Sequence, residues 1–190
     1  MKKMKKWQKI VIWTIATPPV LAGLLLLIYV LVNIQGVIEP FQHGDPGADR
    51  RILIASQGSE FKESLTGELI DNIEADSIFI SIIDVTNLDS IDASEWDAIV
   101  IVHTMQIHKM PKQAMRFLGD MSDLGKVTLV STSGAGDENV DYFDVDGIAT
   151  PSRKYVIPQI VKYVMPRVEE RISVASGHSP PGAADAVSKF

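Results

Sequence analysis

The stretch RILIASQGSEFKESL, residues 51–65, passes from an apolar strand through a short polar loop into a helix. Residues 51–56 supply the apolar run, and Ser59 is placed to cap the helix that follows. A loop between a strand and a helix N-terminus is a favourable place for a phosphate, because backbone N–H groups and the helix dipole attract anions there. The prediction of function therefore starts from this loop.

The residue types around the loop favour opposite conclusions about phosphate binding. Ser56, Gly58 and Ser59 are residue types suited to a phosphate cradle, whereas Glu60 and Glu63 carry negative charge into the first helical turn. At ~5 Å and an effective dielectric near 20, each contact between a phosphate and a carboxylate costs about 3 kcal/mol. The same two carboxylates also stabilise the helix dipole when no ligand is present.

Strands and helices alternate beyond this stretch. Strands that are apolar along most of their length are covered on both faces, which is typical of a parallel sheet flanked by helices. The sequence predicts an α/β domain over residues 51–173 with an open parallel five-stranded sheet. The expected strands are 51–56, 77–85, 97–104, 126–132 and 144–149, and the expected helices are 59–75, 111–124 and 158–172.

Composition excludes several classes of site. The chain has no cysteine, so disulfides, thiolate metal sites and cysteine nucleophiles are absent. The net charge is −6, and all 24 acidic residues follow residue 33. An acidic domain of this kind predicts no nucleic-acid partner.

The first 33 residues read as a basic leader and a transmembrane anchor. Five lysines precede residues 10–32, which carry no charge and are long enough to span a ~30 Å hydrocarbon core. A cleaved signal peptide is the alternative, but no A-x-A-like cleavage site follows the apolar run. We expect an uncleaved signal anchor in a single-pass membrane protein, with the N-terminus cytoplasmic and the acidic domain extracytoplasmic.

Two further segments have compositions typical of irregular structure. Residues 34–50, IQGVIEPFQHGDPGADR, are rich in Gly, Pro and Asp and predict a linker. Residues 174–190 predict a disordered tail.

Three loops at the carboxyl ends of the expected strands are candidates for a ligand site, since ligands of open parallel sheets bind there. Each loop contributes small, polar or flexible side chains. In chain order the candidate cofactor-binding residues are Ser56, Gln57, Gly58 and Ser59; Thr104, Met105, Gln106 and Ile107; and Thr132, Ser133, Gly134 and Gly136.

These loops resemble those of the flavodoxin-like family, in its short form. EWDAIVIVHTMQIHKMPKQAMRFL, residues 95–118, is similar to the family's strand, isoalloxazine loop and following helix, and STSGAG, residues 131–136, resembles its third loop. The resemblance extends from Arg51 to about Ile172. It implies the strand order 2-1-3-4-5, flavin mononucleotide (FMN) as cofactor, and electron transfer to a redox partner protein at the membrane surface.

The chain departs from the family pattern at the ring-binding loops. Residues 103–109 contain no aromatic side chain to hold a flavin ring, and Val140 stands where flavodoxins often have a stacking aromatic. Met105 is able to pack against a ring. A second function therefore stays open, a flavodoxin-like module without cofactor that acts in binding or assembly at the cell envelope.

Other groups of residues that would form a catalytic or a metal site are less well supported by the sequence. Ser59, His103 and Asp137 fall at one sheet edge, but no G-x-S-x-G turn supports a serine hydrolase. His103 and His108 lack a metal-ligand spacing, and the acids from Asp137 to Asp146 lack that of a calcium loop. We predict no catalytic residue and no metal site.

Overall fold

The structure is a computed structural model that describes residues 6–33, 36–73, 77–106, 108–134, 136 and 143–175. The chain divides into two compact units, Met1–Gln35 and Gly36–Phe190. The predicted tail beyond Ala175, and Ile107 among the candidate site residues, lie outside the described residues.

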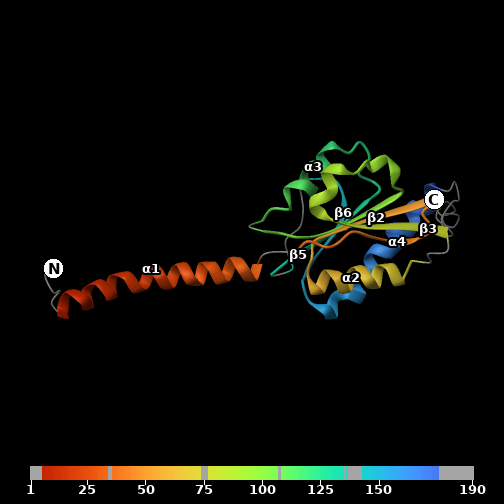
Figure 1. Cartoon of the computed structure of the whole chain (residues 1–190). Coiled ribbons are helices and arrows are strands. Elements are labelled where there is room, and N and C mark those ends of the chain that lie inside the picture. Colours follow the sequence, from red (N-terminus) through yellow and green to blue (C-terminus); the bar gives the residue numbers. More distant parts are fainter. Residues whose placement is uncertain are drawn as a thin grey trace, which may run out of the picture. The chain divides into compact units, whose positions relative to one another are not determined.

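The first unit contains one helix, α1 (Lys6–Asn33), which runs without interruption through Pro18 and Pro19 (Figure 1). Within the described residues, no helix combines the length and the apolar character that crossing a membrane requires. This finding contradicts the predicted transmembrane helix, signal anchor and single-pass localisation.

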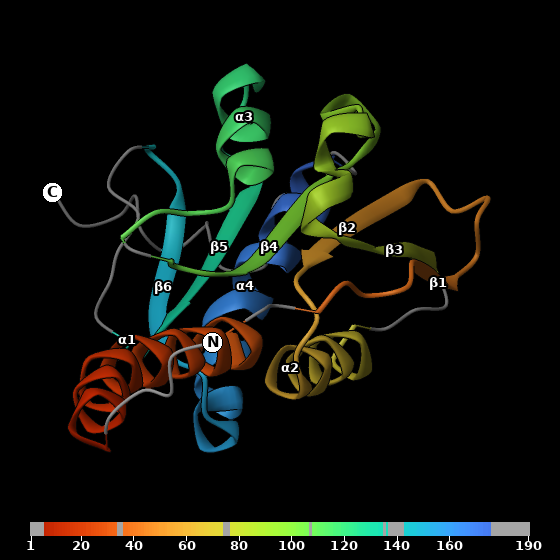
Figure 2. The same cartoon turned by 60° about the vertical axis from the view of Figure 1, so that its left-hand side comes forward.

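The second unit is built on a six-stranded sheet in the order β1-β3-β2-β4-β5-β6 (Figure 2). All neighbouring pairs are parallel except β1 with β3. The predicted five-stranded sheet is therefore wrong, and the order of the sheet differs from the prediction because a further strand is added at one edge; the five predicted strands keep the predicted order among themselves. The strands are β1 (Phe41–Gly44), β2 (Arg50–Ser56), β3 (Ile78–Asp84), β4 (Ala98–Thr104), β5 (Val127–Ser133) and β6 (Asp146–Pro151).

The unexpected strand β1 comes from residues 34–50, which the composition predicts to be a linker. Phe41 pairs with Ile82 and Gly44 with Phe79, so β1 runs antiparallel along the outer edge of β3. All four β1 residues are exposed. An edge strand of this kind is held by backbone hydrogen bonds rather than by buried side chains, so it leaves no hydrophobic pattern in the sequence.

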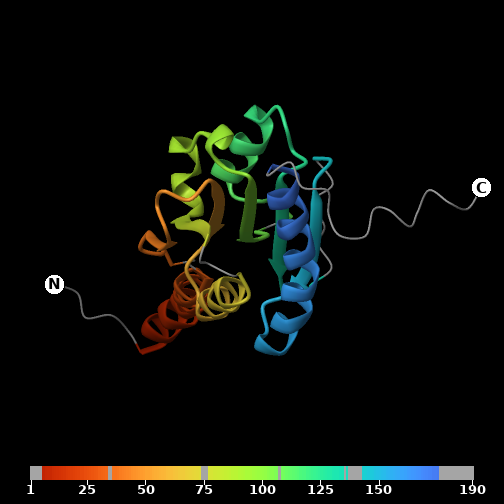
Figure 3. The ribbon, with the colours of Figure 1, turned by 90° about the vertical axis from the view of Figure 1, so that its right-hand side faces the viewer.

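Helices cover both faces of the sheet, with α2 (Glu60–Asp71) and α4 (Ile157–Ala175) on one and α3 (Lys112–Asp120) on the other (Figure 1). Figure 3 shows α4 beside β4 and β5, with which it makes contacts. The 3-10 helices η2 (Val85–Ser90) and η3 (Ala93–Glu95) join β3 to β4, and η4 (Lys154–Val156) precedes α4.

Alternate residues of the interior strands β2, β3, β4 and β5 enter two separate cores, as the pleat requires. Ile52 and Ile54 of β2 pack with Leu65 of α2, whereas Leu53 packs on the other face with Phe117 and Leu118 of α3. The interior strands are buried along nearly their whole length. The apolar runs in the sequence reflect this double coverage.

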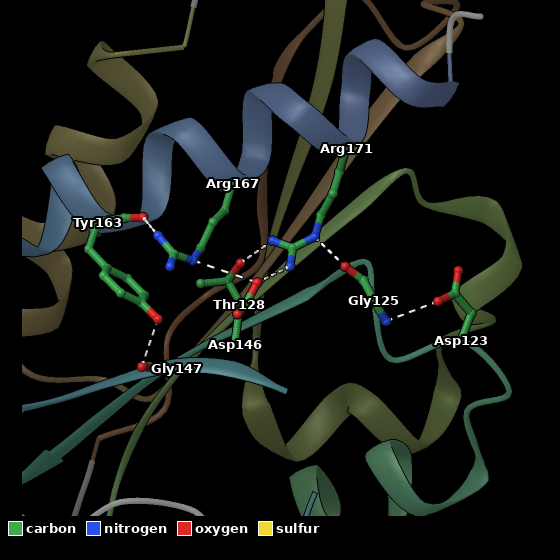
Figure 4. A network of polar contacts seen from close by, with 8 residues as sticks. All are labelled: Asp123, Gly125, Thr128, Asp146, Gly147, Tyr163, Arg167 and Arg171. Carbon is green, nitrogen blue, oxygen red and sulfur yellow. Dashed lines mark hydrogen bonds and ion pairs between the residues drawn. The ribbon is translucent and has the colours of Figure 1, made fainter. Parts of the chain in front are cut away.

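A polar network fixes α4 to the sheet at the end opposite the candidate loops (Figure 4). The Arg171 guanidinium donates to the Gly125 carbonyl, to Thr128 Oγ1 at 2.5 Å and to Asp146 Oδ2 at 2.9 Å. Its side chain is only 13% exposed. One planar cation thus ties α4 to β5, to β6 and to the turn before β5.

We expect Arg171→Lys to lower the free energy of unfolding by about 2 kcal/mol, because a single ammonium cannot reproduce three donors in one plane. Urea denaturation of the full-length chain measures this change. Arg116→Lys is the matched control, since its pair with Asp89 is 63% and 43% exposed. The control should shift the free energy by less than about 0.5 kcal/mol. Equal losses for both variants would contradict the role assigned to Arg171.

Candidate functional site at the carboxyl edge of the sheet

The predicted phosphate loop lies between the last residue of β2, Ser56, and the start of α2 at Glu60. Ser59 is the N-cap of α2, as predicted, and its Oγ accepts from the Lys62 amide at 3.3 Å. The Ser59 hydroxyl is therefore engaged by its own helix.

The backbone of this loop pairs with another part of the chain. The Gly58 amide donates to the Gly36 carbonyl at 2.7 Å, and the Gly36 amide donates to the Gly58 carbonyl at 2.9 Å. The Gln57 amide donates to the Val102 carbonyl at 3.3 Å. A Cβ placed on Gly58 would lie 2.6 Å from the Gly36 carbonyl carbon, closer than packing allows. The segment that begins at Gly36 thus occupies one face of the loop.

A second anchor holds this segment at the end of β3. The Ile38 amide donates to Asp84 Oδ2 at 3.1 Å, and Asp84 Oδ1 accepts from the Thr86 amide at 2.9 Å. The Asp84 side chain is buried. We call residues 36–39 the N-terminal strap, since they cross the carboxyl ends of β2 and β3 between these two anchors.

A buried cation lies beneath the loop. Lys62 is 1% exposed, and its Nζ donates to Thr104 Oγ1 at 2.6 Å. Thr104 Oγ1 is in turn 3.0 Å from Thr132 Oγ1. Burial lowers the pKa of Lys62 to about 8, and the charge of Asp84 acts in the opposite direction. The structure thus brings together Thr104 and Thr132, predicted from separate loops, with a lysine that was not predicted.

The second loop is tied back to its neighbours. Gln57 Oε1 accepts from the Thr104 amide at 2.7 Å, and the Met105 amide donates to the Thr132 carbonyl at 2.8 Å. Gln106 and Lys109 exchange two backbone hydrogen bonds across a tight turn. These contacts hold the predicted residues of the first, second and third loops close together.

The third loop is described only in part. Gly136 has a φ of 79°, in the left-handed region, and its amide donates to Ser133 Oγ at 2.8 Å. A Cβ there would collide with Pro151. Gly134 begins the bend after β5, while Ala135 and residues 137–142, including Val140, lie outside the described residues.

The charge of Glu60 does not face the loop in the way that the sequence suggested. Its Oε1 is 2.7 Å from Lys154 Nζ, before α4, and both side chains are exposed. The hydrogen bond and the charge of Lys154 lower the pKa of the Glu60 carboxyl. The expected repulsion of a phosphate by Glu60 is therefore partly compensated.

His103 does not meet Ser59. Its Nε2 lies 3.0 Å from Ser131 Oγ in the core, and burial lowers the pKa of the imidazole to about 4. The Ser59 hydroxyl caps α2, and Asp137 is outside the described residues. The described residues thus do not assemble the serine-hydrolase arrangement considered from the sequence.

Three residues of this site were missed in the sequence. Gly36 lies in the segment expected to be a linker, and Asp84 ends an apolar strand. Lys62 looks like an ordinary exposed helix lysine. The one sequence feature that indicates its burial is its position next to Phe61, at the margin of the apolar helix face that Leu65 continues.

No protein-family model and no curated protein matches this chain. Solved structures match at low identity. The metal-soaked Flv1 flavodiiron core from Synechocystis sp. PCC6803 is 11% identical, with a TM-score of 0.51 over 68% of this chain and 37% of that one. Azoreductase AzrA and the azoreductase from Bacillus anthracis str. Sterne are 9% and 10% identical, with TM-scores of 0.36 and 0.34; each match covers 67% of this chain and 99% of the azoreductase.

The chain therefore spans little more than a third of the flavodiiron core, 37%. The likeness to that core supports a flavodoxin-like fold for the second unit. At this identity it concerns the fold alone.

The buried ammonium of Lys62 makes stability depend on pH. Between pH 8 and pH 10.5 the folded state has released this proton while the unfolded state keeps it. The free energy of unfolding should therefore rise with pH across that window, by about 3 kcal/mol from this group. We expect the parent to gain this stability relative to Lys62→Met, measured by urea denaturation at several pH values.

The exposed Lys162 on α4 provides the matched control. Lys162→Met should follow the parent across the same pH window, because this variant keeps the buried Lys62. A constant difference in free energy between the parent and Lys62→Met would show that the Lys62 ammonium is not desolvated.

Proposed function

We propose that the second unit is a flavodoxin-like binding module that works without a flavin. The observation that carries this proposal is the double hydrogen bond between Gly36 and Gly58, at 2.9 and 2.7 Å. The strap holds the part of the loop that would have to receive the FMN phosphate. The module then binds its ligand or partner elsewhere.

To place its phosphate in this loop, FMN would have to displace the strap. Opening the strap breaks the two Gly36–Gly58 hydrogen bonds and the one from Ile38 to Asp84. At about 1 kcal/mol each, these contacts would weaken FMN binding about a hundredfold. Opening would also leave the buried Asp84 carboxylate with one hydrogen bond fewer, which adds to the cost.

The loop expected to hold the flavin ring offers few contacts that would offset this loss of binding free energy. The described part of the second loop, residues 104–106 and 108–109, offers Met105 and Gln106 but no aromatic side chain. Met105 is itself buried in the core. Stacking, the usual source of affinity for a flat aromatic ring, would have to come from elsewhere.

The second candidate is an FMN-binding electron carrier. The buried Lys62 ammonium and the hydroxyls of Thr104 and Thr132 favour it, because they concentrate a cation and hydrogen-bond donors at the carboxyl edge. The resemblance of the fold to a flavodiiron core is consistent with it. In this function the strap would be a gate that FMN displaces.

Flavin titration of the full-length chain separates the two functions. We expect the parent to bind neither FMN nor riboflavin more tightly than about 10 µM, followed by absorbance near ~450 nm and flavin fluorescence. Gly36→Pro removes the amide that donates to Gly58 and so weakens the strap. This variant should also fail to bind FMN.

The control is Gly47→Pro, which removes an amide from an exposed turn away from the loop. Stoichiometric FMN binding by the parent would overturn the proposal. Binding by Gly36→Pro alone, with riboflavin bound more weakly than FMN, would establish the gated electron carrier instead.

A further inference from the structure

A cavity of about 410 Å³ lies between the strap, strand β1 and helix α2. Its volume is at the lower end of the ~300–1,000 Å³ range of small-molecule sites. The apolar wall comes from Val37, Ile38, Phe41 and Ile82. Ser56 is the one predicted site residue among the side chains that line it. The strap that closes the phosphate loop is thus also a wall of this cavity.

The charge around the cavity has one sign. Glu39 and Glu63 are both exposed and both line it, and no lysine or arginine is among its lining residues. Neither carboxylate forms an ion pair with the residues that the structure describes. Phe41 adds an aromatic side chain to the same wall, and aromatic faces attract organic cations.

A glycine keeps part of the cavity open. Gly67 lies inside α2, where glycine is less favourable to a helix than alanine. A Cβ built on Gly67 would meet no atom within 4 Å, so packing against the rest of the protein does not exclude a side chain there. Any larger residue would occupy space at the cavity wall.

We propose that this cavity binds a small organic cation, an amine whose apolar part lies against Phe41 and Ile82 and whose ammonium lies near the carboxylates of Glu39 and Glu63. This names the ligand class of the binding module and rests on that proposed function, because the strap must stay in place to form the wall. The site requires no flavin and no metal.

The probe is 2-phenylethylamine, with 2-phenylethanol as its neutral counterpart of the same shape. Ligand-observed NMR titration of the full-length chain measures the affinity of each. We expect the amine to bind at least tenfold more tightly than the alcohol, since only the amine carries the charge that the two carboxylates favour.

Gly67→Leu should abolish binding by filling the cavity, without lowering the melting temperature, because leucine favours a helix more than glycine does. Gly119→Leu is the matched control. Gly119 is also a helical glycine on which an added Cβ would meet no atom within 4 Å, but it lies in α3 away from the cavity. This control should bind the amine as the parent does.

Glu63→Gln should weaken amine binding about tenfold and leave alcohol binding unchanged. Glu68→Gln, on the same helix but outside this cavity, should change amine binding less than twofold. Should Gly67→Leu fail to fold, this pair of variants carries the test. Equal affinity for amine and alcohol, no binding of the amine, or amine binding that survives both Gly67→Leu and Glu63→Gln would overturn the proposal.

Failure here is distinguishable from failure of the proposed function. A chain that binds neither flavin nor the amine remains a cofactor-free module with a different ligand. A chain that binds FMN, and loses the amine when FMN is added, disproves the cofactor-free module. In that case FMN displaces the strap, and with it the wall of the amine site.

Discussion

The pair of backbone hydrogen bonds between Gly36 and Gly58 constrains the carboxyl edge of this unit. Neither glycine can be treated as an ordinary loop residue, since a side chain on Gly58 would overlap the backbone of Gly36. Once Gly36 is fixed there, Ile38 reaches Asp84 and Phe41 enters register with Ile82. The pairing of Gly36 with Gly58 therefore directs the strap across the ends of β2 and β3. The chain that follows the strap then joins the sheet as the edge strand β1.

The same arrangement changes how charge is balanced at this edge. A helix N-terminus above parallel strands favours an anion, and an external phosphate is one way to supply it. Here the Asp84 carboxylate and the Lys62 ammonium both belong to the protein and are both buried. Their opposite charges, with the hydroxyls of Thr104 and Thr132, form an internal polar layer. The charges of this layer are balanced within the protein, without a ligand.

Sequence patterns predicted the parts of this fold that depend on buried apolar side chains, such as β2, β4 and the cap of α2 at Ser59. They failed where backbone pairing, or contacts between residues far apart in the sequence, determine the structure. Phe41–Gly44 has no buried side chain to signal a strand, and the partner of Gly58 lies far back in the sequence. Lys62 was not predicted at the site, because the hydroxyls that receive its ammonium come from β4 and β5, far from it in the sequence. The transmembrane prediction rested on the length of the uncharged run 10–32 and on the five lysines before it, and it is contradicted among the described residues.

The strap connects the two parts of the functional argument. If its only role were to fill a lost cofactor loop, tight apolar packing against α2 would serve, and alanine at position 67 would stabilise the helix at no packing cost. Instead the strap stands away from α2 and leaves a cavity whose wall holds a helical glycine and two carboxylates that form no ion pair with the described residues. The glycine lowers the stability of the helix, and an apolar wall beside two carboxylates suits a ligand that is both apolar and cationic. The binding site is therefore better sought beside the strap than beneath it.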